Sequence, residues 1–192
     1  MSGGATWVDG IHGKAMKLQM NDDNKIVFTA HPSLNVGDYT LSFWIKFTNS
    51  PASGSTQYRN VIKKDAGVTS DRAPDIWICP TFQSGLKVAL HWRHNPGNVG
   101  FDCLGPGGEV TPLNGKPGFT LNQWYHVYGG KQGTTLKVYI AQAGSSYQAF
   151  TKTGIPNPMA QGDGNFIIGD AGSESAGFEI DSLELYNTFI DL

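Results

Sequence analysis

The stretch Gly177-Phe178-Glu179-Ile180-Asp181-Ser182-Leu183-Glu184-Leu185-Tyr186-Asn187 decides the fold. Its side chains alternate between apolar and polar with the period of a half-buried β-strand. The apolar set changes phase between Ile180 and Leu183, which indicates one extra residue, a β-bulge, at Asp181-Ser182. With that bulge, three acidic side chains lie on one face of the strand: Glu179, Asp181 and Glu184.

Composition points to the same class of fold. The chain has 192 residues, the size of one domain, and we expect residues 1–192 to form a single unit. It contains 25 glycines and 10 prolines, and only 16% of its residues are charged, a profile typical of turn-rich β proteins. No segment keeps a helical period beyond one turn. The sequence therefore predicts an all-β fold, a two-sheet antiparallel jelly-roll sandwich.

Short alternating segments, separated by turn residues, mark the expected strands. They are 15–18, 25–28, 39–47, 60–63, 75–82, 86–92, 99–104, 123–128, 136–141, 165–169 and 178–186. We expect hairpins between 75–82 and 86–92, and between 123–128 and 136–141 across the turn 129–133. In 39–47 the alternation is clean: Leu41, Phe43, Ile45 and Phe47 share one face, and Ser42, Trp44 and Lys46 share the other.

Charge and hydropathy exclude several classes of function. A net charge of −2 argues against nucleic acid or an anionic membrane surface as a partner, because both need basic patches. No apolar run approaches the roughly 20 residues of a membrane span, so we expect no membrane insertion. The first residues have neither a basic nor an apolar region, so we expect no signal peptide in this chain. Cys79 and Cys103 either form a disulfide, worth about 3 kcal/mol, or are buried free thiols.

Further segments of the chain resemble those of the concanavalin A-like lectin/glucanase superfamily, in particular its laminin-G-like domains. The matching segments are 7–15, 39–47, 121–127, 136–140, 167–170 and 180–187. Each match is short, but they follow the order and spacing of the family from Trp7 to Asn187. The resemblance implies a jelly-roll domain, and most laminin-G-like domains only bind.

An enzyme is the alternative that the same resemblance raises. Glu179-x-Asp181-x-x-Glu184 is the spacing of a retaining glycosidase, whose two carboxyl groups stand roughly 5–5.5 Å apart. In the glucanase relatives, however, the catalytic strand lies mid-chain, and an apolar residue stands where this chain has Ser182. A fold and a short motif do not fix function. We therefore expect a protein without enzymatic activity, and a small β-glucanase-like hydrolase that uses Glu179, Asp181 and Glu184 as the alternative.

Calcium is the cofactor that the resemblance implies, because laminin-G-like relatives often hold one Ca²⁺ at the rim. Calcium takes oxygen ligands, which loops rich in Asp and Asn supply. The best candidate ligands are Asn21, Asp22, Asp23 and Asp181, and a second candidate is 163–165 with Asp170. The alternative is that these are turn residues, since Asn and Asp bond their own backbone.

A cluster of aromatic and basic residues is the best candidate for a ligand site. Sugar rings stack on aromatic side chains while polar groups fix their orientation. Trp77 and Trp92 fall on adjacent expected strands, and polar or aromatic residues near them complete the candidate set: Tyr58, Arg72, His91 and Arg93. We expect the remaining tryptophans, Trp7, Trp44 and Trp124, to pack in the core or between the sheets.

Together these observations predict a recognition module that binds a glycan or a protein surface, as a carbohydrate-binding lectin or an adhesion protein does. Because the chain starts at Met1 without a leader or a second domain, we expect a phage or virus context. There the protein decorates a capsid or associates with a tail, and capsid or tail proteins are its partners. The expected location is extracellular or on the virion surface.

Overall fold

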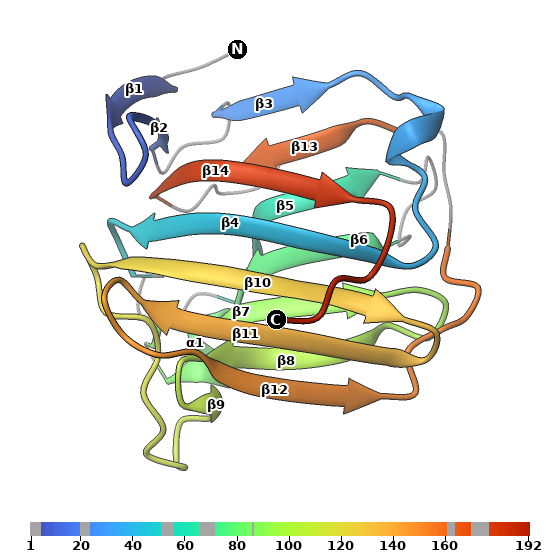
Figure 1. Ribbon diagram of the computed structural model, residues 1–192. Coiled ribbons are helices and arrows are strands. Elements are labelled where there is room, and N and C mark those ends of the chain that lie inside the picture. The colour runs from blue at the N-terminus through green and yellow to red at the C-terminus, as the bar shows by residue number, and fades with distance from the viewer. Residues whose placement is uncertain are drawn as a thin grey trace.

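The computed structural model describes residues 5–19, 24–50, 56–65, 72–85, 87–160, 164–169 and 177–192, and nearly all of its regular structure is β (Figure 1). The strands are β1 (Thr6–Asp9), β2 (Lys14–Leu18), β3 (Lys25–Phe28), β4 (Tyr39–Phe47), β5 (Arg59–Asp65), β6 (Arg72–Ile78), β7 (Leu90–His94), β8 (Val99–Gly105), β9 (Gly108–Glu109), β10 (Trp124–Gln132), β11 (Thr135–Gln142), β12 (Gln148–Thr153), β13 (Phe166–Gly169) and β14 (Phe178–Tyr186). A 3₁₀ turn, Pro32–Leu34, and a short helix α1, Thr81–Ser84, complete the regular elements of the described ranges.

The strands form two seven-stranded sheets that pack face to face (Figure 1). The front sheet has the order β1-β2-β14-β4-β10-β11-β12, and the back sheet has the order β3-β13-β5-β6-β7-β8-β9. Neighbouring strands are antiparallel throughout. The predicted two-sheet jelly-roll sandwich is confirmed. The extent of the domain, residues 1–192, stays a prediction.

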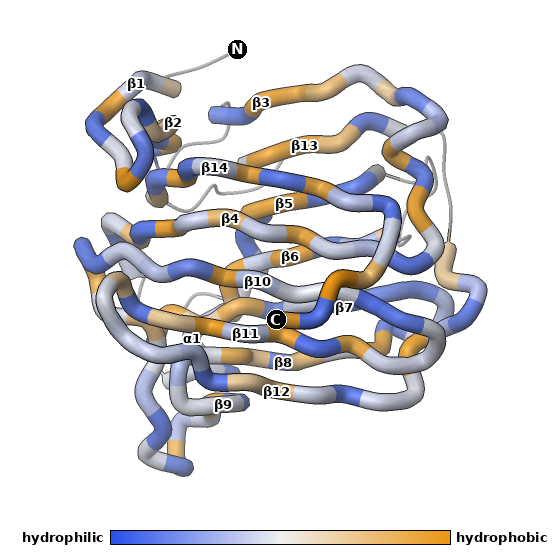
Figure 2. The backbone as a smooth tube through the Cα atoms, viewed as in Figure 1, coloured by the Kyte–Doolittle hydropathy of each residue, from blue (hydrophilic) through white to orange (hydrophobic). Residues whose placement is uncertain are grey.

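Apolar side chains from the inner faces of both sheets fill the space between them, where Figure 2 shows apolar positions recurring along the strands. On β4 the predicted alternation is confirmed. Its inner residues Leu41, Phe43, Ile45 and Phe47 are fully buried. The back sheet contributes Ile76, Ile78, Leu90 and Trp92 to the same core. Burial of apolar surface at about 25 cal/mol per Å² is what holds the two sheets together.

The predicted β-bulge in β14 is confirmed. Asp181 pairs with Trp44 and Glu184 pairs with Ser42, so the register shifts between the two pairs. Ser182, inside the bulge, has a φ of 49°. Because of this extra residue the acidic side chains of β14 keep to the outer face of the front sheet, beside the outer residues of β4.

Both expected hairpins are present, with two differences. β6 and β7 pair, but β6 ends at Ile78 and β7 begins at Leu90, and residues 81–82, expected in a strand, belong to α1. β10 and β11 also pair, but the predicted turn 129–133 is wrong, because β10 continues to Gln132. Gly129 belongs to the strand and lies against the core, where a Cβ would meet the Trp92 ring at 2.9 Å. A glycine thus leaves room for a large indole rather than ending a strand.

Among the described residues, no helix combines the length and the apolar character that a membrane crossing requires.

Candidate functional site

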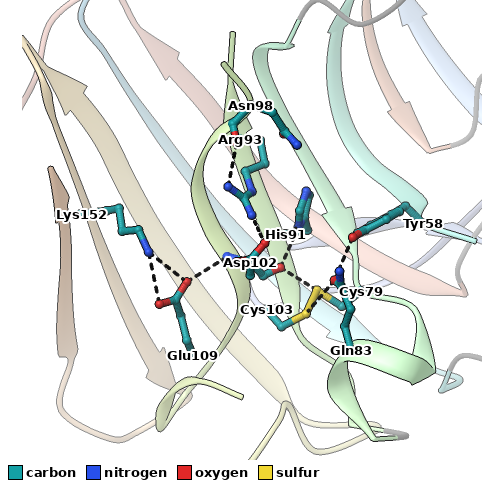
Figure 3. Close-up of polar contacts among 10 residues, drawn as sticks. All are labelled: Tyr58, Cys79, Gln83, His91, Arg93, Asn98, Asp102, Cys103, Glu109 and Lys152. Atoms are coloured by element: carbon teal, nitrogen blue, oxygen red, sulfur yellow. Dashed lines mark hydrogen bonds and ion pairs between the residues drawn. A yellow bond between two sulfur atoms is a disulfide. The ribbon is translucent and has the colours of Figure 1, made fainter. Parts of the chain in front are cut away.

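All but one of the side chains predicted to bind a ligand lie together on the outer face of the back sheet. We call this group the arginine–aromatic cluster; it comprises Tyr58, Arg72, Trp77, His91 and Arg93. The register of β6 and β7 places Trp77 opposite His91, so the two side chains project to the same side. Tyr58 precedes β5 and reaches them from the neighbouring strand. Figure 3 shows Tyr58, His91 and Arg93 together on this face.

The rings of the cluster pack directly on one another. Trp77 and His91 are parallel within 4°, with centroids 5.6 Å apart. The Tyr58 ring lies 4.6 Å from His91 and 5.5 Å from Trp77. The guanidinium carbon of Arg72 stands 4.4 Å from the centre of the Trp77 ring, within the range of a cation–π interaction. The result is a continuous aromatic surface with a cation on it.

The prediction that Trp92 contacts a ligand is wrong. Trp92 pairs with Ile76, so its side chain projects into the core, where it is 0% exposed. Its indole Nε1 donates a hydrogen bond to the Tyr39 hydroxyl at 2.9 Å. Neighbouring residues of a strand point to opposite faces, so His91 and Trp92 cannot serve the same surface.

A chain of polar contacts borders the cluster on the side of β8 and β9 (Figure 3). Arg93 forms an ion pair with Asp102 and donates a hydrogen bond to the Asn98 carbonyl at 2.7 Å. The backbone N–H of Asp102 donates to the Glu109 carboxylate at 2.9 Å. Lys152 of the front sheet reaches the same carboxylate at 3.4 Å. These contacts fix one arginine of the cluster in place.

His91 is neutral at physiological pH. The side chain is 3% exposed, and burial lowers its pKa to about 3, with the charges of Arg93 and Arg72 adding to the effect. Its Nδ1 lies 2.7 Å from the Asp102 carbonyl oxygen, which only accepts hydrogen bonds. Nδ1 therefore carries the proton, and Nε2 offers a lone pair. Burial also lowers the pKa of both arginines, which nevertheless keep their protons.

A disulfide of the back sheet links the end of β6 to β8, two strands apart. Cys79, directly after β6, is bonded to Cys103 of β8 with a Cα–Cα distance of 5.8 Å. Of the two alternatives, the structure therefore has the disulfide. The hydroxyl of Tyr58 donates to the side-chain carbonyl of Gln83, in α1, at 2.8 Å. Within the cluster, Tyr58 is thus held by Gln83, and Arg93 is held by Asp102 (Figure 3).

The three carboxylates of β14 share the outer face of the front sheet, but each has a different partner. Glu179 is 6% exposed and forms an ion pair with Lys46 of β4. Asp181 is equally buried, and its Oδ2 accepts a hydrogen bond from the backbone N–H of His12 at 2.8 Å. It thereby holds the turn between β1 and β2. Glu184 is exposed and accepts a hydrogen bond from the Tyr186 hydroxyl at 2.7 Å.

The candidate calcium ligands Asn21, Asp22 and Asp23 lie outside the described residues, as do Asp163 and Asp170. Within the described ranges, no group of three or more His, Cys, Asp or Glu side chains could hold a metal ion. The calcium site stays a prediction. The Oδ1 of Asn24, next to the candidate loop, is buried and has no hydrogen-bond partner in the described part of the chain. An amide oxygen of this kind is a ligand that calcium accepts.

The remaining tryptophans are not in the core, which corrects the sequence-based expectation. Trp7 is 59% exposed, and Trp44 and Trp124 are half-buried on the outer face of the front sheet. Sequence reasoning missed that Trp44 packs against His126, with ring centroids 4.9 Å apart. The alternation along β4 was the available signal, because it already separated Trp44 from the inner residues.

Several solved structures have a similar fold. They include the binding domain of Paraclostridial Mosquitocidal Protein 1 (13% identity, 100% of this chain and 44% of that chain, TM-score 0.59). Domain 4 of AbnA, a GH43 extracellular arabinanase from Geobacillus stearothermophilus in complex with arabinotriose, is also similar (18% identity, 96% of this chain and 75% of that chain, TM-score 0.56). The alginate lyase from Klebsiella pneumoniae is similar too (11% identity, 94% of this chain and 83% of that chain, TM-score 0.59). This chain spans less than half of the mosquitocidal chain.

At such low identity these likenesses concern the fold alone. No curated protein matches the sequence. The family comparison reaches further, because residues 20–191 match the family model described as "Concanavalin A-like lectin/glucanases superfamily". The match covers most of the chain and agrees with the observed two-sheet sandwich. The chain therefore belongs to this laminin-G-type family of the concanavalin A-like lectin/glucanase superfamily.

Proposed function

We propose that this protein is a non-catalytic carbohydrate-binding module and that the arginine–aromatic cluster is its binding face. The observation that carries the proposal is the packing of Tyr58, Trp77 and His91 into one surface with Arg72 upon it. Sugar C–H faces pack on aromatic rings, and guanidinium groups donate to sugar oxygens. Since His91 is neutral, it adds no charge to this surface.

The similar structures support a glycan as the ligand class to test first. One of them is a binding domain, and another was solved with arabinotriose. A protein surface is the other partner that such a face fits. The cluster resembles a protein interface in its arginine and aromatic content, so binding of a protein without binding of any glycan would favour that partner.

A glycan array with matched variants tests the proposal. We expect the parent protein to bind one glycan class, and Trp77→Ala to lose most of that signal while it keeps its fold. Trp7→Ala is the control, because Trp7 is exposed and belongs to β1 of the front sheet. If no glycan binds the parent protein, or if Trp77→Ala binds as well as the parent, the proposal is wrong.

A glycoside hydrolase is the second candidate, favoured by the shared face of Glu179, Asp181 and Glu184. The contacts of the first two oppose it: an ion pair occupies Glu179, and Asp181 holds a turn. Hydrolysis of a β-glucan by the parent protein, abolished by Glu179→Gln, would establish the enzyme. Absence of turnover by the parent protein across β-glucans rejects it.

The setting in which the module acts belongs to the same proposal: outside the cell or on a virion surface, with capsid or tail proteins as further partners. This part rests on the sequence. Co-sedimentation of the purified protein with intact particles tests it, and a protein that stays in the supernatant with every particle would remove the virion context.

Calcium binding is likewise part of the proposal. At a calcium concentration 100 times the dissociation constant, binding adds about 2.7 kcal/mol to the free energy of unfolding. Thermal melting in calcium and in EDTA measures this difference. We expect a lower melting temperature in EDTA and a smaller difference in Asp22→Asn, and identical melting curves for the parent protein would rule out the ion.

A further inference from the structure

Among the described residues, the C-terminal segment covers one part of the outer face of the front sheet, and side chains on another part remain partly exposed. Thr40 donates a hydrogen bond to the Thr188 carbonyl at 2.9 Å, and Tyr128 donates to the Ile190 carbonyl at 2.7 Å. Lys137 pairs with Asp191 at 2.6 Å. Figure 1 shows this segment passing over β10 and ending beside β11. These contacts cover the ends of β4, β10 and β11 that lie away from Trp44.

The partly exposed region of this face contains two packed aromatic rings, those of Trp44 and His126. Trp44 of β4 and His126 of β10 are direct cross-strand partners, with ring centroids 4.9 Å apart. The ring of His12 meets Trp44 edge-on at 6.2 Å. Both Trp44 and His126 remain partly exposed. An indole held in this way can receive a flat apolar surface without losing much side-chain freedom.

Three hydrogen-bonding side chains, Ser42, His126 and Tyr147, form a connected line beside Trp44. Ser42 Oγ lies 3.0 Å from His126 Nε2, and His126 Nδ1 lies 2.5 Å from the hydroxyl of Tyr147. Tyr147 is 45% exposed, so the end of the chain reaches solvent. Burial lowers the pKa of His126, which is therefore neutral at physiological pH, with one donor and one acceptor nitrogen.

The neutral imidazole makes the Tyr147 hydroxyl adaptable. When Nδ1 carries the proton, it donates to the Tyr147 oxygen, and the phenolic O–H points to a ligand. When Nε2 carries it, Tyr147 donates to Nδ1 and its oxygen offers a lone pair to the ligand. A partner that both donates and accepts, such as a sugar hydroxyl, matches this group in either tautomer.

The charge of this face selects against acidic ligands. Asp181 stands opposite Trp44, and Glu184 stands opposite Ser42. Of these three carboxylates, Glu179 forms an ion pair with Lys46 of the same face. A uronate or sulfated sugar would meet the like charges of Asp181 and Glu184 here, whereas at the arginine–aromatic cluster it would meet Arg72, with Arg93 already paired to Asp102.

We propose that Trp44, His126 and Tyr147 form a second saccharide site, separate from the arginine–aromatic cluster, that takes a neutral sugar residue. The sugar packs its C–H face on Trp44 and exchanges hydrogen bonds with Tyr147. The inference stands on different residues from the proposed function, so either site can bind without the other.

Calorimetric titration tests the second site with arabinotriose and cellotetraose as neutral probes and with a trimeric uronate as the acidic probe. For a neutral probe, we expect Trp44→Ala to weaken binding by roughly 10-fold. Tyr147→Phe keeps the ring and removes the hydroxyl, and we expect it to weaken binding by roughly 5-fold. Phe82→Ala removes an exposed ring of α1 that belongs to neither proposed site, and it is the control that should leave the affinity for that probe unchanged. Trp77→Ala reports binding at the arginine–aromatic cluster.

Three results would overturn the inference: no binding of either neutral probe at millimolar concentration, unchanged affinity in both front-face variants, or tighter binding of the uronate at this site. Loss of neutral-probe binding in Trp77→Ala alone would place the sugar at the arginine–aromatic cluster, which supports the proposed function and removes the second site. Circular dichroism melts of each variant separate loss of binding from loss of fold, and Tyr147→Phe remains informative if Trp44→Ala does not fold.

Discussion

The outer face of the back sheet surrounds its aromatic rings with Arg72 and Arg93, whereas the outer face of the front sheet surrounds its rings with carboxylates. Both faces arise in the same way, from polar and aromatic residues that alternate with core residues along a strand. They differ in their bracing as well. A disulfide and an ion-pair chain hold the back face, while the C-terminal segment lies across part of the front face. One sandwich therefore presents two braced aromatic surfaces that differ in the charged side chains beside their rings.

Trp92 and Trp77 lie on neighbouring strands of the back sheet but on opposite faces, Trp92 in the core and Trp77 on the outer face. We expect Trp92→Ala to lower the free energy of unfolding by about 3–5 kcal/mol, because it leaves a large cavity in the core. Trp77→Ala removes a half-buried ring and should cost about 1 kcal/mol. Urea denaturation of both variants measures the difference. Equal losses would contradict the assignment of the two tryptophans to opposite faces.

Register explains why these two residues were hard to separate from sequence. On β7, Leu90 and Trp92 alternate with His91 and Arg93, yet both sets contain a ring. The sequence does not say which ring faces the core until β6 is paired with β7. The bulge in β14 was predictable, because a change of apolar phase within one strand has one simple explanation. The contact between His126 and Tyr147 was not, since it joins residues across a long hairpin.

Two ion pairs of the front sheet allow a buried contact to be compared with an exposed one. Lys46→Met leaves Glu179 buried without its partner, and we expect a loss of about 2–3 kcal/mol. Lys14→Met breaks the pair with Asp9, which is open to solvent, and should leave the melting temperature unchanged. Thermal denaturation at low and high salt measures both. If Lys46→Met melts like the parent protein, the ion pair is not holding β14 to β4.

The back sheet should lose stability in acid through its histidines. The pKa of His91 and that of His94 are each lowered to about 3 by burial, below the unfolded value of 6.5. Between these values the unfolded chain binds more protons than the folded one. Stability is therefore complete above pH 6.5 and falls as the pH drops toward 3, by at most about 1.4 kcal/mol per pH unit for each histidine.

Urea denaturation as a function of pH measures this slope, and His91→Gln is the variant to compare. Its free energy of unfolding should fall less steeply between pH 6 and 4, by about one histidine's share of the slope. The other charged groups near His91 are Arg72, Arg93 and Asp102, and Asp102→Asn controls for the carboxylate. A pH profile that His91→Gln leaves unchanged would show that His91 is not the titrating group.

The smallest expected effect concerns the bulge that keeps the acids on the front face. Ser182 has a φ of 49°, a left-handed conformation that glycine adopts without strain. We expect Ser182→Gly to change the free energy of unfolding by less than about 1 kcal/mol, and Ser182→Val to lower it by about 1–2 kcal/mol. Chemical denaturation distinguishes the two. Tolerance of valine would indicate that β14 pairs without the bulge.

The path of the C-terminal segment decides how these surfaces are best presented in an experiment. Leu192 is 60% exposed and follows the residues that pass over β10 and end beside β11 (Figure 1). An affinity tag or a sensor-chip linker fused there would lie over the outer face of the front sheet and sterically block its access to an immobilised sugar. The same attachment leaves the opposite sheet accessible. Surface plasmon resonance with the protein anchored through its first and then its last residue would reveal which side of the molecule holds the ligand.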